Sequence, residues 1–142
     1  MKTLEQMEAL MKEALAADLG EFRPCAFFDD RLDCIRIIAR DCSVLEERIN
    51  EGITVLVDNY YPGPGRKRRY VGFTIKGARH FCQEHRLSLT SPIKMTELLD
   101  AIMASFPDEV VQMFVDFVAK PLVAEEKIDE VEIPDDAILQ PA

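Results

Sequence analysis

Apolar residues recur at helical spacing near the start of this chain. A helix over about residues 3–19 would place them along one face, because they lie three or four residues apart. Thr3 and Gln6 have the spacing of a capping box, and Gly20 supplies a stop signal. The residues of this apolar face are Leu4, Met7, Leu10, Met11 and Leu15.

In the middle of the chain the apolar period changes to that of a strand. Ile53, Val55 and Val57 are separated by single residues, as on one face of a strand. The run from 70 to 75 is rich in β-branched and aromatic residues. The Pro-Gly-Pro-Gly sequence at 62–65 indicates a turn or loop. We therefore expect a long hairpin here.

The stretch from 32 to 51 fits two different structures. One consists of a helix over 32–42 and a second helix over 44–51, and the other consists of strands over 43–49 and 53–59 with a turn between them. The residues that fit a helical face are Leu32, Ile35, Ile38, Ala39 and Cys42, and those that fit a strand are Ile35, Ile37 and Ala39. The pattern alone leaves both open.

Two further helices are predicted after residue 90. Ser91-Pro92 opens the first, over about 93–106, whose apolar residues recur at helical spacing. Pro107 separates it from a second helix over about 108–119, which Pro121 closes. The second helix is apolar nearly all round, so it is either central to the core or pressed against another subunit. The candidate oligomer contact consists of Val110, Val111, Phe114, Phe117 and Val118.

The length of 142 residues suits one domain, and a composition of 48% hydrophobic and 30% charged residues is that of a globular protein. Seven acids and one lysine follow residue 124, so most of the net charge of −9 lies there. We expect one α+β domain over 1–124 and an acidic tail over 125–142. With neither a signal peptide nor a spanning segment in the pattern, we expect a cytoplasmic protein with reduced cysteines.

Three blocks of the sequence resemble a small bacterial domain family of unknown function. The run from Phe28 to Ile37, with aspartates at 29 and 33, resembles its opening Tyr-Asp-x-x-x-Asp-x-Leu-Tyr-Ile. Residues 46–58 resemble its acidic strand, turn and Val-rich strand, and residues 71–78 resemble its closing Val-Gly-Ile-Glu-Ile block. Thr74 stands where the family has glutamate, and the loop at 59–69 is long and basic.

This resemblance implies that residues 32–51 are strands. It implies a four-stranded antiparallel β-meander, about 25–29, 32–41, 43–58 bent at Gly52, and 69–78, within a β core over about 25–82. One N-terminal helix and two C-terminal helices would flank the meander. Because family members are often small partners of toxin-like proteins, it also implies an antitoxin-like or other protein-binding role.

A basic run, Arg66-Lys67-Arg68-Arg69, follows Tyr60-Tyr61 and the Pro-Gly loop. Clustered cations with nearby aromatic rings are typical of phosphate and base contacts, and within a hairpin they resemble the wing of a winged-helix protein. The other interpretations are a solvated loop, a contact with a protein and a contact with the chain's own acidic tail. This run and the two tyrosines are the candidate partner or nucleic-acid contact.

Other titratable groups do not form a motif for catalysis or for metal binding. The aspartates at 29, 30 and 33 have the chemistry of a tight turn, because short acidic side chains accept hydrogen bonds from nearby backbone N–H groups. The cysteines at 25, 34, 42 and 82 are too widely spaced for structural zinc. A nucleophile–base pair of Cys82 with His80 or His85 lacks a recognisable third group. We therefore assign no catalytic residue, metal or cofactor.

These observations predict a non-enzymatic interaction module that acts through a protein partner, with a homodimer as one form of contact. The alternative is a DNA-binding regulator of the winged-helix type with its wing at 66–69. The two hypotheses differ in the structure that they require for residues 32–51.

Overall fold

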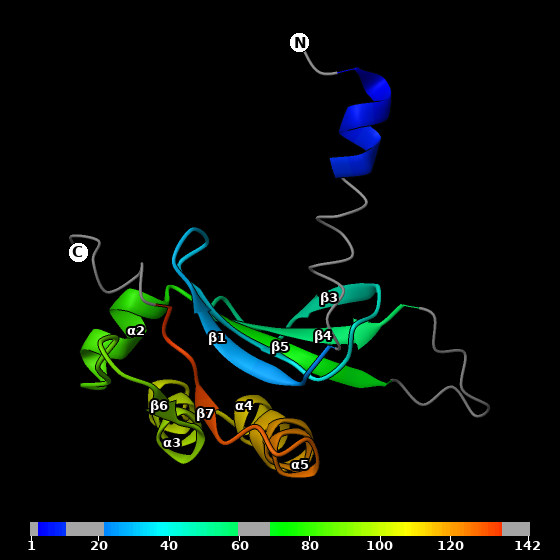
Figure 1. Cartoon of the computed structure of the whole chain (residues 1–142). Coiled ribbons are helices and arrows are strands. Elements are labelled where there is room, and N and C mark those ends of the chain that lie inside the picture. Colours follow the sequence, from blue (N-terminus) through cyan, green and yellow to red (C-terminus); the bar gives the residue numbers. More distant parts are fainter. Residues whose placement is uncertain (1–2, 11–21, 60–68, 135–142) are drawn as a thin grey trace.

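The computed structural model describes residues 3–10, 22–59 and 69–134. Its centre is a five-stranded antiparallel sheet in the order β1-β2-β5-β4-β3 (Figure 1). The five strands are β1 (Cys25–Asp29), β2 (Cys34–Ile38), β3 (Val44–Arg48), β4 (Ile53–Asp58) and β5 (Tyr70–Lys76). Residues 4–10 are helical, as the N-terminal pattern predicts, and the rest of the helix predicted over about 3–19 lies outside the described residues.

A second layer covers one face of this sheet (Figure 1). Its elements follow β5 in the chain, and none of the helices in the described ranges has the length and apolar character needed to cross a membrane. In order they are α2 (Ala78–Glu84), β6 (Ile93–Lys94), α3 (Met95–Ser105), α4 (Glu109–Phe114), the π-helical turn η1 (Val115–Ala119), α5 (Lys120–Glu125) and β7 (Glu130–Val131).

The α+β class and the antiparallel sheet are confirmed, but the four-stranded meander is wrong. β5 lies between β2 and β4 instead of at an edge, and residues 43–58 form two strands instead of one bent strand. The side chain of Asn50 stabilises the turn between them, because its Oδ1 accepts hydrogen bonds from Gly52 N and Ile53 N, each at 2.8 Å. Residues 34–38 and 44–48 are strands, so the helix pair that a winged-helix fold requires at 32–51 is not formed.

The two edges of the sheet differ. Along β1, Phe28 N donates to Glu132 O at 2.9 Å, and Glu132 N donates to Ala26 O at 2.8 Å. β7 also pairs with β6, so the chain after α5 closes this edge (Figure 1). Residues 125–134, which the sequence assigns to an acidic tail, are therefore part of the fold, whereas 135–142 lie outside the described residues. β3 forms the opposite edge and is rich in charged residues, which suits an edge strand.

The core lies between the sheet and the helical layer. Phe73 on the central strand is fully buried, and its ring meets that of Phe114 edge-on at 5.2 Å between centroids. The apolar face predicted for 93–106 is the face that α3 buries, through Met95, Leu98, Leu99 and Ile102. Burial of these side chains is the main source of stability, at about 25 cal/mol per Å² of apolar surface.

Two boundaries differ from the sequence prediction for local reasons. The last helix continues to Glu125 through Pro121, because the wider η1 turn comes directly before that residue, and proline is tolerated in the first turn of α5. The predicted β core ends at Lys76 instead of 82, because Gly77 adopts φ 64° and α2 begins at the next residue.

Candidate functional site

The helix formed by α4 and η1 presents two apolar stripes that face in different directions. One stripe points into the core: Phe114 is 4% exposed and Val111 is 1% exposed. The other stripe consists of Val110, Met113 and Phe117, which follow one another at i, i+3 and i+7 and therefore share a face. All three are exposed, and the side chain of Phe117 is 74% exposed. One helix thus packs the core and offers an apolar surface to its surroundings.

This outer stripe forms one wall of a groove against the sheet. The groove has a volume of about 230 Å³, and among its lining residues only Glu47 is charged. Val55 and Phe114 are the buried members of the lining, whereas Tyr70 and Phe117 are exposed. The lining residues are Glu47, Ile49, Val55, Tyr70, Val110, Met113, Phe114, Phe117 and Val118; we call this set the α4 groove.

The α4 groove exists because the helical layer does not extend over β3. Leu45 and Glu47 lie on the same face of β3, since side chains two residues apart in a strand point the same way, and they pair with Val57 and Val55 of β4. Those two β4 residues are buried in the core, but Leu45 is 55% exposed. The apolar surface therefore continues from the helix across the groove to the sheet edge. Apart from the carboxylate of Glu47 and the hydroxyl group of Tyr70, the residues that line the groove have apolar side chains.

The predicted oligomer contact is divided between the core and this groove. Val111 and Phe114 belong to the core. Val111 does not line the groove, so it is not part of the contact surface, and Phe114 contributes only to the base of the groove. Val110, Phe117 and Val118 line the groove. Met113 was identifiable from its spacing to Val110 and Phe117. Ile49 and Tyr70 were not, because they reach the groove only through strand pairing distant in sequence.

Of the basic candidate site, Arg69 is among the described residues. Tyr60, Tyr61, Arg66, Lys67 and Arg68 lie outside the described residues. The remaining member, Arg69, lies at the start of β5, where its Nη1 is 3.8 Å from Asp58 Oδ2 and its backbone carbonyl accepts a hydrogen bond from Asp58 N. Arg69 therefore closes the β4–β5 hairpin at its base.

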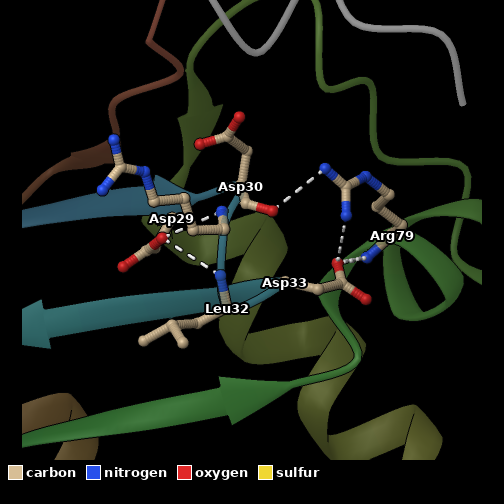
Figure 2. Close-up of polar contacts among 6 residues, drawn as sticks. Asp29, Asp30, Leu32, Asp33 and Arg79 are labelled. Carbon is tan, nitrogen blue, oxygen red and sulfur yellow. Dashed lines mark hydrogen bonds and ion pairs between the residues drawn. The ribbon is translucent and has the colours of Figure 1, made fainter.

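The three aspartates near residue 30 form the turn that their spacing predicts, and this turn also holds α2 (Figure 2). Asp29 Oδ1 accepts hydrogen bonds from Arg31 N at 3.1 Å and Leu32 N at 3.2 Å. Asp33 adopts φ 49°, and its Oδ1 accepts from Arg79 N at 2.9 Å. Since Arg79 is in the first turn of α2, Asp33 caps that helix from a distant part of the chain. These carboxylates thus have structural partners.

Replacing Asp33 by alanine is expected to lower the free energy of unfolding by about 2 kcal/mol, through the lost cap and the strained left-handed backbone. The Asp33→Asn variant keeps an acceptor oxygen and tolerates positive φ, so it should lose less than about 1 kcal/mol. Urea denaturation of both variants measures the difference. Equal losses would show that the charge of Asp33, which lies 3.5 Å from Arg79 Nη1, matters more than the cap.

The candidate nucleophile–base residues His80 and Cys82 lie on α2, and His85 follows at the C-terminal end of that helix. All four cysteines are free thiols, and no group of three potential metal ligands occurs among the residues described. His80 Nε2 lies 3.0 Å from Glu84 Oε1 on the surface of α2. Cys82 is on the buried side of α2, where burial, with a smaller contribution from the charge of Asp33, raises its pKa from 9.0 to about 11. A raised thiol pKa opposes thiolate formation, which is the reverse of what a nucleophile requires.

This raised pKa predicts a loss of stability at alkaline pH. Between pH 9 and about 11 the thiol of Cys82 ionises in the unfolded chain but stays protonated in the fold, so the unfolded state binds fewer protons and stability falls as pH rises. The raised pKa of Cys82 contributes at most about 3 kcal/mol to the free energy of unfolding, and all of this contribution is present below pH 9. Chemical denaturation of the wild type and of Cys82→Ala from pH 8 to 11 should show a shallower decline for the variant. Parallel curves would contradict this account.

Comparison of the chain with protein-family models, with curated proteins and with solved structures gave no significant match.

Proposed function

We propose that this protein is a non-enzymatic interaction module that binds a protein segment in the α4 groove. The observation that carries the proposal is the exposed apolar stripe on α4 and η1, with Phe117 at 74% exposure, beside the uncovered face of β3. Single exposed apolar residues are ordinary, but aligned ones that continue into a groove are typical of contact surfaces.

The groove favours one kind of ligand. Its lining is apolar apart from Glu47 and the hydroxyl group of Tyr70, so apolar side chains supply most of the contact area. An amphipathic helix fits such a surface, since it presents apolar anchors three or four residues apart to a groove between two elements. Aromatic and methionine side chains adapt to an inserted partner, and the groove contains Tyr70, Met113 and Phe117.

An antitoxin-like role, which the family resemblance implies, is one form of this protein-binding function. The winged-helix form of the DNA-binding alternative needs helices over 32–42 and 44–51, where β2 and β3 lie, and its basic run lies outside the described residues apart from Arg69.

Photocrosslinking in cells tests the proposal. A photoreactive phenylalanine analogue replaces Phe117, and the matched control carries the same analogue at Gln112, which is exposed on the same helix but does not line the groove. We expect discrete adducts from position 117 and not from position 112. If position 117 gives no adduct, or the same pattern as position 112, the groove is not a binding surface and the proposal fails.

A further inference from the structure

We propose that the α4 groove binds the N-terminal helix of a second copy of this chain, so that two copies exchange these helices. The inference rests on the proposed function, because it names the segment that the groove binds. It follows from two apolar surfaces that are exposed among the described residues of one copy.

The first surface is the helix itself. Thr3 N donates to Gln6 Oε1 at 3.0 Å and Gln6 N donates to Thr3 Oγ1 at 3.2 Å, which is a complete capping box. All described residues of this segment, 3–10, are exposed, including the apolar stripe of Leu4, Met7 and Leu10 at 73%, 50% and 45%. Most of the stability of a helix in water comes from packing its apolar face against another element. This segment therefore has a defined start and a face that needs a partner.

The second surface is the α4 groove, and its chemistry matches. Leu4 and Leu10 are separated by about 9 Å along a helix axis, at 1.5 Å per residue. Three apolar anchors on one helical face are the pattern that a helix-binding groove accepts. The acidic residues of the segment, Glu5 and Glu8, flank this stripe and are exposed, so they can remain in water while the stripe is buried.

The place where the N-terminal segment joins the sheet favours exchange between copies over docking within one copy. The N-terminal segment joins β1, whereas the groove lies between β3 and the α4–η1 helix, and β1 and β3 are opposite edges of the sheet. Figure 1 shows the N-terminal helix on the side of the sheet away from α4 and α5. The eleven residues at 11–21 span at most about 40 Å when extended, so the N-terminal helix and β1 of one copy lie within about that distance of each other in the exchanged dimer. Reciprocal exchange then gives a closed, two-fold symmetric dimer.

Mass measurement on full-length variants tests this proposal. The helix variant is Leu4→Glu with Leu10→Glu, and the groove variant is Phe117→Glu; all three side chains are exposed, so the folded body is not expected to change. Matched controls place the same charge on the opposite face of each helix, as Ala9→Glu and Gln112→Glu, both at exposed positions. Light scattering after size exclusion should show dimers for the wild type and for both controls, and monomers for the helix and groove variants.

Mixing the two monomeric variants gives the decisive result. In an equimolar mixture the intact helix of the groove variant meets the intact groove of the helix variant, so heterodimers with one of the two contacts should form. A monomeric wild type, a dimer that survives the helix variant, or a mixture that stays monomeric would each overturn the exchange. If the wild type is monomeric while position 117 still crosslinks to another protein, the exchange fails and the proposed function stands. A crosslink from position 117 to residues 3–10 within the same molecule also overturns the exchange.

Discussion

Replacing Phe114 by alanine is expected to lower the free energy of unfolding by about 3–5 kcal/mol, whereas Phe117→Ala should change it by less than about 0.5 kcal/mol. The two residues are three positions apart on one helix, but Phe114 is 4% exposed and meets Phe73 edge-on, while Phe117 is 74% exposed. A buried ring leaves a cavity when it is removed, and an exposed ring does not. Urea denaturation of the isolated variants at low concentration measures both values.

The same pair separates stability from binding. At concentrations where the groove is occupied, Phe117→Ala should weaken association although the fold is intact, because Phe117 contributes its ring to the contact. A loss of several kcal/mol for Phe117→Ala in a monomeric sample would contradict its position on the outer stripe. It would also remove the reason for treating that stripe as a contact surface.

Gly72→Ala is expected to lower the free energy of unfolding by about 3 kcal/mol or more. Gly72 is on β5, the central strand, and a Cβ at this position would lie 2.1 Å from the carbonyl oxygen of Ile37 on β2. That oxygen belongs to backbone and not to a flexible side chain, so β2 and β5 must separate. Overpacking of this kind costs about 1–3 kcal/mol in side-chain cores, and the cost is larger where a strand must move.

Gly77→Ala is the matched control for this variant. Gly77 adopts φ 64°, but no atom lies within 4 Å of an added Cβ, so only the conformational cost of about 1–2 kcal/mol applies. Denaturation curves of the two variants, together with amide exchange in β2, test the distinction. If Gly72→Ala costs no more than Gly77→Ala, then β5 does not pack as closely against β2 as its register indicates.

The parts of the fold that were predictable are those with a local signal. The capping box at Thr3 and Gln6, the alternation from Ile53 to Val57 and the helical face of α3 each depend on residues close together in sequence. Likewise, the aspartates of the β1–β2 turn bond to backbone groups two or three residues away.

The parts that were missed depend on long-range pairing. β5 could not be placed between β2 and β4 from its own pattern, because a buried strand has the same apolar run at any interior position. Pro121 predicts a helix end, because nothing in the sequence indicates the η1 turn that accommodates it. Glu132 covers the β1 edge through its backbone N–H and carbonyl, which every residue other than proline provides.

Half of the candidate site was predictable in the same sense. The spacing of Val110 and Phe117 identifies an apolar helix face, but not which side of the helix the core uses. Only the structure divides Phe114 from Phe117, and only the strand order brings Ile49 and Tyr70 to the other wall of the groove.

Methyl NMR of the full-length chain tests the central structural claim, that the α4 groove binds the N-terminal helix of a second copy. Met113 lines the groove and Met7 lies on the N-terminal helix, both at least half exposed in a single copy, whereas Met95 is buried and serves as a reference. With increasing protein concentration, we expect the methyl signals of Met113 and Met7 to shift together and become protected from a soluble paramagnetic probe, while the Met95 signal stays constant. Met113 and Met7 methyl groups that remain accessible to the probe and unshifted at every concentration would contradict the account.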